Sequence, residues 1–214
     1  MRIVAVPVKS LSRAKSRLSS VLSPIERGAL TLAMLEDVLD ATMQLAAWET
    51  WVVSPDEVVL EVAVRRGARP VREPTPTLLG AVRHVDDEAT ARDADALAVI
   101  LADTPLLTAE VLATVVRTMG PVVLGPSADR SGTNLLLRRP PRAIRPRFGR
   151  DSFAKHRAEA EDKGLPVAVV DAPQIAFDLD APDDILTLLS ANVPGRTLDV
   201  CRELELESRL RVHT

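Results

Sequence analysis

The 214-residue chain has almost no cysteine and no long apolar segment. Cys201 is its only cysteine, which excludes an internal disulfide and is typical of a reducing compartment. No apolar run approaches the roughly 20 residues that a membrane helix needs. The first apolar run ends too early, at Lys9, to be a secretory signal. We therefore expect a cytoplasmic protein with no membrane partner.

Aromatic residues are also scarce, at 2% of the chain with no tyrosine, and the net charge is −3. A nucleic-acid-binding surface usually combines a basic balance with aromatic side chains that stack on bases. The sequence has neither, so we expect small-molecule substrates and no nucleic acid. A homodimer stays open.

Apolar residues make up 46% of the chain and occur in short runs that alternate with helical patterns. This alternation predicts an α/β fold, a three-layer α/β/α sandwich around a mostly parallel sheet, with a partly antiparallel flank in the second half. The expected strands are 2–8, 51–54, 70–72, 96–102, 121–124, 134–137, 167–170 and 176–179. The expected helices are 24–47, 56–66, 77–92, 108–119, 151–163 and 182–189. We expect one domain over residues 1–191, and a loosely attached tail over 192–214 that can hold one more helix.

Asp103 ends the most apolar strand, in the sequence Asp-Ala-Leu-Ala-Val-Ile-Leu-Ala-Asp-Thr-Pro-Leu-Leu-Thr from 95 to 108. A run that is apolar on both faces is typical of a buried parallel strand, and Pro105 ends it. Asp103 is therefore expected at the carboxyl end of the strand, where open α/β sheets bind ligands. A carboxylate there is unfavourable without a partner, and a metal ion is the obvious candidate.

A second acidic pair lies in Phe177-Asp178-Leu179-Asp180. Alternation along a strand would place Asp178 and Asp180 on one face. Together with Asp103 they would offer oxygen ligands to a hard cation such as Mg²⁺. For Asp180 the alternative is a helix N-cap just before Pro182.

A basic loop follows the first strand and carries Lys9, Lys15 and Arg17. The first strand–helix turn is a usual phosphate-binding place, but this one lacks the glycine pattern of a Rossmann turn or a P-loop. Charge would therefore have to come from side chains. Taken alone, the loop fits a solvated basic face better.

Residues 138–157 contain seven arginines, one lysine and one histidine against one acid. Gly149 permits a close backbone approach, and a helix that begins at Asp151 or Ser152 points its first amides at an anion. With Arg147 and the preceding Gly-Thr133-Asn segment, this region suits a small phosphorylated acid. The alternative is a capped surface helix with a basic flank. His156 is expected to be a structural or surface residue rather than a base.

The order of these motifs resembles the 2-phospho-L-lactate and phosphoenolpyruvate guanylyltransferases of coenzyme F-420 biosynthesis, over residues 3–189. The matching pieces are Val-Lys9, Ala-Lys15-Ser-Arg17-Leu, Ala-Asp103-Thr-Pro-Leu-Leu, Asp129-Arg-Ser-Gly-Thr133-Asn, Arg147-Phe-Gly149-Arg-Asp-Ser152 with His156, and Asp178-Leu-Asp180. At Leu79 the sequence departs from an asparagine frequent in the family, which leaves the nucleobase open.

The resemblance implies a nucleotide-diphospho-sugar transferase-like fold, of the GT-A-like Rossmann type. It also implies that Asp103, Asp178 and Asp180 hold one or two Mg²⁺ ions, and that Lys9, Lys15 and Arg17 face the triphosphate of GTP. Thr133, Gly149 and Ser152 would hold the acceptor's phosphate and carboxylate. Asp103, Lys15 and Arg17 are the residues expected to act on the reacting phosphates.

The implied reaction transfers GMP from GTP to the phosphate of a small acid and releases pyrophosphate. A phosphate monoester, with a second pKa of about 6, is mostly dianionic at neutral pH and needs no general base. The alternatives are a nucleotidyltransferase with another acceptor (3-phosphoglycerate, a sugar phosphate or molybdopterin) and a catalytically silent binding protein on the same fold.

Overall fold

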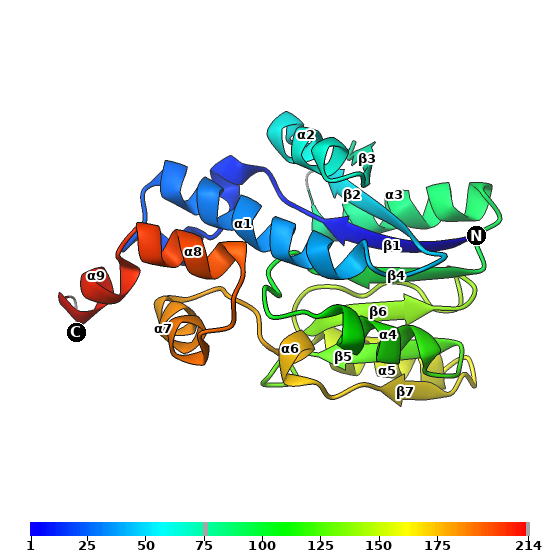
Figure 1. The fold of residues 1–214 in the computed structure, drawn as a ribbon. Coiled ribbons are helices and arrows are strands. Elements are labelled where there is room, and N and C mark those ends of the chain that lie inside the picture. The colour runs from blue at the N-terminus through cyan, green and yellow to red at the C-terminus, as the bar shows by residue number, and fades with distance from the viewer. Residues whose placement is uncertain (75–76, 213–214) are drawn as a thin grey trace.

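A seven-stranded sheet forms the middle layer of the computed structural model, which describes residues 1–74 and 77–212. Its strand order is β3-β2-β1-β4-β6-β5-β7 (Figure 1). The strands are β1 (Arg2–Pro7), β2 (Glu49–Ser54), β3 (Arg69–Arg72), β4 (Ala96–Ile100), β5 (Val122–Pro126), β6 (Thr133–Arg138) and β7 (Val167–Val169). Only β6 runs antiparallel to its neighbours within this sheet, so the mostly parallel sheet with a mixed flank is confirmed.

Helices cover both faces of the sheet (Figure 1). They are α1 (Pro24–Thr42), α2 (Glu57–Arg65), α3 (Leu78–Ala91), α4 (Ala109–Arg117), α5 (Ser152–Glu161), α6 (Pro173–Ala176), α7 (Pro182–Ala191), α8 (Arg196–Glu203) and α9 (Leu206–Val212). In β1, Val4 and Val6 pack toward α1, α2 and α4, whereas Ile3 and Ala5 pack toward α3. This alternation confirms the three-layer sandwich. No helix in the described part of the chain is long and apolar enough to span a membrane.

The start of α1 shows how local sequence fixes an element. Ser23 and Glu26 form a capping box, in which the Ser23 amide donates to the Glu26 carboxylate at 2.8 Å and the Glu26 amide donates to Ser23 Oγ at 3.3 Å. Pro24 occupies the first helical position, where no amide hydrogen is needed. The helix therefore begins where the sequence predicts.

The strand predicted over 176–179 is wrong. Residues 173–176 form the short helix α6, and no strand is found over 177–180. Ile175 of α6 packs against Gly125 of β5 so closely that a Cβ at Gly125 would lie 2.5 Å from Ile175 Cγ2. The following segment is held by one backbone hydrogen bond to the loop after β4, from Leu179 N to Asp103 O at 2.9 Å. Alternation of Phe, Asp, Leu and Asp therefore marks an extended segment rather than a paired strand.

The segment after Asn192 is packed on the body of the protein, where the sequence predicted a loosely attached tail. The carboxylate of Asp37 in α1 accepts from Arg196 N at 2.6 Å and from Thr197 N at 2.8 Å, at the start of α8. Leu198 and Cys201 of α8 are buried. Helices α1 and α8 lie side by side (Figure 1). The last two residues, 213–214, lie outside the described residues.

Strand β6 is tied to α3 by a buried ion pair. The guanidinium of Arg138 donates to the two carboxylate oxygens of Asp86 at 2.6 and 2.8 Å. A bidentate pair of this kind fixes both distance and orientation. It holds the strand that begins with Thr133 and Asn134.

Candidate functional site

The residues predicted to bind the metal and the triphosphate gather where β1 and β4 end and β6 begins. Asp103 comes three residues after β4, and the basic loop follows β1 directly. Leu101 N donates to Asn134 O at 2.9 Å, so the first residues of the antiparallel strand β6 lie beside the carboxyl end of β4. The expected position of Asp103 is therefore confirmed.

Lys15 is the centre of a charged cluster, by which we mean Lys15, Arg17, Asp103, Asp178 and Asp180. Its Nζ donates to Asp103 Oδ2 at 2.9 Å and to Asp180 Oδ1 at 2.7 Å. The Lys15 side chain is only 7% exposed. The residue has a left-handed backbone, with φ of 50°, between the short 3-10 turns 11–13 and 16–18. This local turn directs the Lys15 side chain inward. The sequence alone favoured a solvent-exposed basic face instead.

The ion pairs of Lys15 fix its charge. Burial by itself lowers the pKa of the ammonium, but the charges of Asp103 and Asp180 outweigh burial and raise that pKa above its usual value. Burial likewise raises the pKa of Asp180, whereas Lys15 and Arg17 lower it, and the net shift is downward. At neutral pH the cluster therefore holds one buried cation between two carboxylates.

Asp178 is the carboxylate that Lys15 does not contact by a hydrogen bond in the described structure. Its Oδ1 accepts from Asn134 Nδ2 at 3.3 Å, and the same amide donates to Ile175 O at 2.9 Å. Burial, reinforced by the charge of Asp103, raises the pKa of Asp178 to about 6. The Oδ1 atom of Asp103 is buried without a hydrogen-bond partner among the described residues. Two repelling carboxylates, one with an unpaired oxygen, favour an added cation.

The donor set fits a magnesium ion that binds together with phosphates. Within residues 1–74 and 77–212, no three His, Cys, Asp or Glu side chains form a complete metal site. Mg²⁺ commonly takes only one or two carboxylates and completes its shell with water and substrate phosphates. Asp178 and the unpaired Oδ1 of Asp103 supply such a pair. Lys15 binds the other oxygen of Asp103 and also Oδ1 of Asp180.

The alternative for Asp180, a helix N-cap, is wrong. Ala181 precedes α7, and the carboxylate of Asp184 accepts from Asp180 N at 2.8 Å and from Ala181 N at 2.6 Å. The side chain of Asp180 is thereby left to Lys15.

A second group, which we call the neutral cluster, consists of Thr133, Gly149, Ser152 and His156. Thr133 Oγ1 lies 3.0 Å from His156 Nδ1. His156 follows Ser152 by one turn of α5. Gly149 has φ of 118°, and a Cβ there would meet no atom within 4 Å, so open space adjoins it. Among the described residues, neither Thr133 nor Ser152 donates its hydroxyl hydrogen to a carboxylate or a carbonyl. Thr133 and Ser152 are each only 2% exposed, and their hydroxyls are the polar groups that the neutral cluster could offer to a ligand.

Three basic residues that the sequence assigns to substrate contacts, Lys9, Arg17 and Arg147, differ in their surroundings. The guanidinium of Arg147 folds onto Glu159, with Nε and Nη2 at 3.0 and 2.7 Å from Oε2. Arg17 is 75% exposed and lies 3.7 Å from Asp180. Lys9 is exposed, and its charge contributes to the lowered pKa of Asp180. Arg17 is thus the exposed member of the charged cluster, Lys9 is a second exposed cation near it, and the pair of Arg147 with Glu159 braces α5.

The sequence did not predict two contacts of this region, that of Asn134 with Asp178 and that of His156 with Thr133. Both join residues that adjoin each other at the start of β6. The β5–β6 pairing shifts register there, where Pro126 pairs with Thr133 and Gly125 with Leu135. Such a bulge re-aims side chains, so Asn134 and Thr133 reach different partners. The Gly-Thr-Asn sequence was the only local signal.

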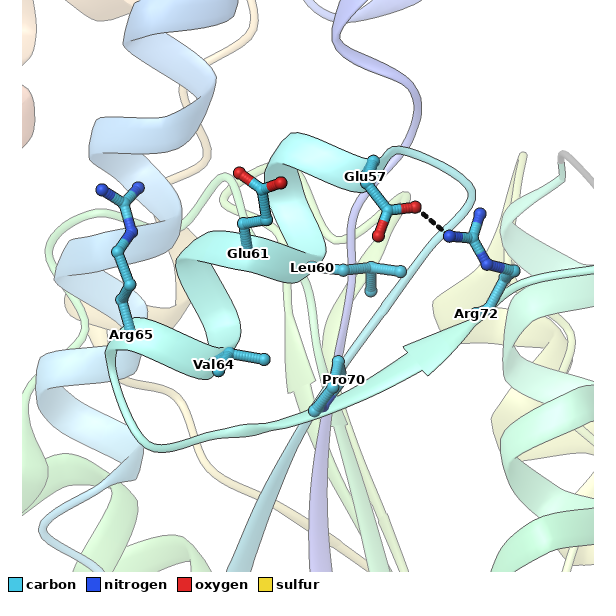
Figure 2. A pocket seen from close by; sticks show the side chains of 7 residues that line it. All are labelled: Glu57, Leu60, Glu61, Val64, Arg65, Pro70 and Arg72. Atoms are coloured by element: carbon cyan, nitrogen blue, oxygen red, sulfur yellow. Dashed lines mark hydrogen bonds and ion pairs between the residues drawn. The ribbon is translucent and has the colours of Figure 1, made fainter.

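A groove of about 600 Å³ lies elsewhere, between α2 and β3. Figure 2 shows Leu60 and Val64 of the helix above Pro70 of the strand, with an ion pair between Glu57 and Arg72 at one end. None of the predicted site residues lines this groove. The predicted site is therefore not this groove.

A family model described as "Guanylyl transferase CofC like" matches residues 1–210. A phosphoenolpyruvate guanylyltransferase from Sphaerobacter thermophilus is 40% identical over 200 residues, which are 92% of this chain and 97% of that protein. A 3-phospho-D-glycerate guanylyltransferase from Phenylobacterium zucineum is 37% identical over 199 residues, which are 90% and 91% of the two chains.

The fold also matches a solved structure from Desulfovibrio desulfuricans, provisionally described as a nucleotide-diphospho-sugar transferase. The TM-score is 0.80 at 17% identity, and the match covers 100% of this chain and 99% of that one. At that identity the likeness bears on the fold alone, and it confirms the expected fold class.

Proposed function

Because this chain belongs to the CofC-like guanylyl transferase family, we propose that it transfers GMP from GTP to the phosphate of phosphoenolpyruvate. The reaction forms a bond between an acceptor phosphate oxygen and the α-phosphorus, and breaks the bond from that phosphorus to the oxygen of the leaving pyrophosphate. The family resemblance places this step in coenzyme F-420 biosynthesis.

The observation that carries the proposal is the Lys15 ammonium, held 2.9 Å from Asp103 and 2.7 Å from Asp180 at the carboxyl edge of the sheet. Joining two polyanions requires charge neutralisation and alignment more than proton transfer. Lys15 supplies a fixed positive charge, and the exposed Lys9 and Arg17 extend that charge outward to the triphosphate.

Asp103 and Asp178 would hold Mg²⁺, which neutralises phosphate charge when bound. Asp180 binds Lys15 through Oδ1, so we assign it first to holding Lys15, and its Oδ2 could add a further ligand to the ion. Asn134 would restrain the Asp178 carboxylate through its 3.3 Å hydrogen bond.

On the acceptor side, the hydroxyls of Thr133 and Ser152 would donate to the acceptor's phosphate or carboxylate, beside the open space at Gly149. No residue need act as a general base, because a phosphate with a second pKa of about 6 is already mostly dianionic. His156 is unsuited to that role, since burial and the charges of Arg138 and Arg147 lower its pKa to about 4.

The test is pyrophosphate release by the purified protein with Mg²⁺, GTP or ATP, and one acceptor at a time. The acceptors are phosphoenolpyruvate, 2-phospho-L-lactate and 3-phospho-D-glycerate. We expect release with GTP and phosphoenolpyruvate together and with neither alone, and a product of the mass of the guanylylated acid. Release with another acceptor only would correct the substrate, and no release in any combination would contradict the proposal.

A further inference from the structure

His156 is the only histidine that the described structure buries completely, and both of its ring nitrogens are engaged. Its exposed fraction is 0%, and the ring of Phe148 packs edge-on against it with centroids 5.1 Å apart. Nδ1 lies 3.0 Å from Thr133 Oγ1, and Nε2 lies 2.8 Å from the backbone nitrogen of Arg147. The ring therefore bridges the start of β6 and the segment before α5.

The partner at Nε2 determines where the ring proton sits. A backbone N–H can only donate, so Nε2 must present its lone pair to Arg147. Burial and the charges of Arg138 and Arg147 lower the pKa of His156 to about 4, so the ring is neutral at pH 7. A neutral imidazole carries one proton, which must be on Nδ1. His156 is thus the donor in its hydrogen bond to Thr133.

This direction constrains Thr133 in turn. A hydroxyl has one hydrogen and two lone pairs, and one lone pair here receives the His156 proton. The hydroxyl hydrogen of Thr133 must point elsewhere, and no acceptor for it is found among residues 1–74 and 77–212. Thr133 also precedes Asn134, whose amide holds Asp178. The unused donor therefore lies one residue from Asn134, which contacts the charged cluster through Asp178.

We propose that His156 is a positioning residue that fixes the Thr133 hydroxyl as a donor toward an anionic oxygen of the acceptor. This inference rests on the proposed function, because the anion in question is the acceptor's phosphate or carboxylate. Without the ring, the Thr133 hydroxyl could turn its hydrogen inward and present a lone pair to the anion.

Two substitutions of similar size separate the two hydrogen bonds of the ring. His156→Asn places an amide nitrogen near the position of Nδ1 and keeps a donor for Thr133. His156→Gln reaches the position of Nε2, keeps an acceptor for the Arg147 amide and loses the donor for Thr133. Both remove the ring from the same buried site, so each is the packing control for the other.

We expect His156→Gln to raise the KM for the acceptor about tenfold, the order expected for one hydrogen bond to a charged group, with the KM for GTP unchanged. His156→Asn should stay within a few-fold of the wild type. Thr133→Val should match His156→Gln, and the double variant should be no worse than either, because both remove one interaction. Equal effects of His156→Asn and His156→Gln on the KM for the acceptor would overturn the proposal. A parallel rise in the KM for GTP and the KM for the acceptor would also overturn it.

A measurement on the unaltered protein covers the case in which the variants fail to fold. Long-range proton–nitrogen NMR correlations of the histidine rings report which nitrogen carries the proton, and the His84 and His213 signals are assigned by substitution at those positions. We expect His156 as the Nδ1–H form at pH 7, and a shift of its Nδ1 signal on adding acceptor to the protein. An Nε2–H form, or no response to the acceptor, would overturn the inference. Failure of the wild-type transfer assay would instead overturn the proposed function, and the tautomer would be unaffected.

Discussion

The charged cluster and the neutral cluster adjoin each other through Thr133 and Asn134, yet they are stabilised in opposite ways. In the charged cluster, Lys15 lies between two carboxylates, and Asp178 is left protonatable near pH 6 by burial and by Asp103. In the neutral cluster, His156 is uncharged and each ring nitrogen has one partner. Ion pairs of the first kind can rearrange around a metal and a triphosphate. A hydrogen-bonded network of the second kind stays fixed and presents hydroxyls.

The difference predicts that substitutions in the charged cluster act on the chemical step. Asp103→Asn should lower kcat for pyrophosphate release by about 10³-fold, because a ligand for the phosphate-neutralising metal is lost. The amide is isosteric and Asp180 still pairs with Lys15, so thermal unfolding is measured in parallel to show that the variant remains folded. Asp171→Asn, at an exposed carboxylate paired with Arg130, is the matched control and should keep full activity. Undiminished turnover of the Asp103 variant would contradict the metal assignment.

Lys15→Met should have the next largest effect, a fall in kcat of about 10²-fold with a raised KM for GTP. The long apolar side chain fills the same space but leaves Asp103 and Asp180 without a cation between them. Steady-state kinetics with varied GTP measure both constants. Lys163→Met, at an exposed lysine that contacts Ala143 O, controls for loss of a charge. A Lys15 variant with normal KM and kcat would show that the triphosphate binds elsewhere.

Substitutions in the neutral cluster should act on acceptor binding alone. Ser152→Ala should raise the KM for phosphoenolpyruvate about tenfold and leave the KM for GTP unchanged, because one hydrogen bond to a charged ligand is lost. Ser190→Ala in α7, whose hydroxyl contacts Leu186 O at 2.8 Å, is the control. If Ser152→Ala raised both KM values equally, the two clusters would not serve different substrates.

The smallest expected effect is on stability. Asp178 has a pKa of about 6 in the fold and about 3.9 in an unfolded chain. The folded state therefore binds more protons between these values, and the free energy of unfolding falls as pH rises from about 4 to about 6. The Asp178→Asn variant has no carboxyl group at this position, so this part of the fall in the free energy of unfolding is absent. Urea unfolding of metal-free protein should show the variant gaining stability relative to the wild type across that range, and a constant difference would contradict the raised pKa.

The sequence predicted what depends on local pattern. The apolar run before Asp103 specifies a buried strand and its end, and Ser23-Pro24-Ile-Glu26 specifies the start of α1. The extended segment around Asp178 was taken for a strand because alternation describes a backbone conformation and not whether it finds a partner in the sheet.

The contacts that the sequence could not supply join distant residues. Lys15 meets Asp180 across 165 positions, and only the folded sheet brings the loop after β1 to the segment before α7. His156 could be assigned a structural role from its surroundings, but its bond to Thr133 depends on how α5 packs on β6. Such contacts follow from topology and side-chain reach, which no local pattern encodes.

The assignment of the charged cluster to a metal-bound nucleotide is tested most directly by crystals grown with Mn²⁺ and a non-hydrolysable GTP analogue. Anomalous scattering locates the manganese ion without reference to the protein atoms. We predict a peak coordinated by Asp103 and Asp178 and by phosphate oxygens of the analogue, with the Lys15 ammonium beside the triphosphate. A bound nucleotide whose metal touches neither carboxylate would contradict the account.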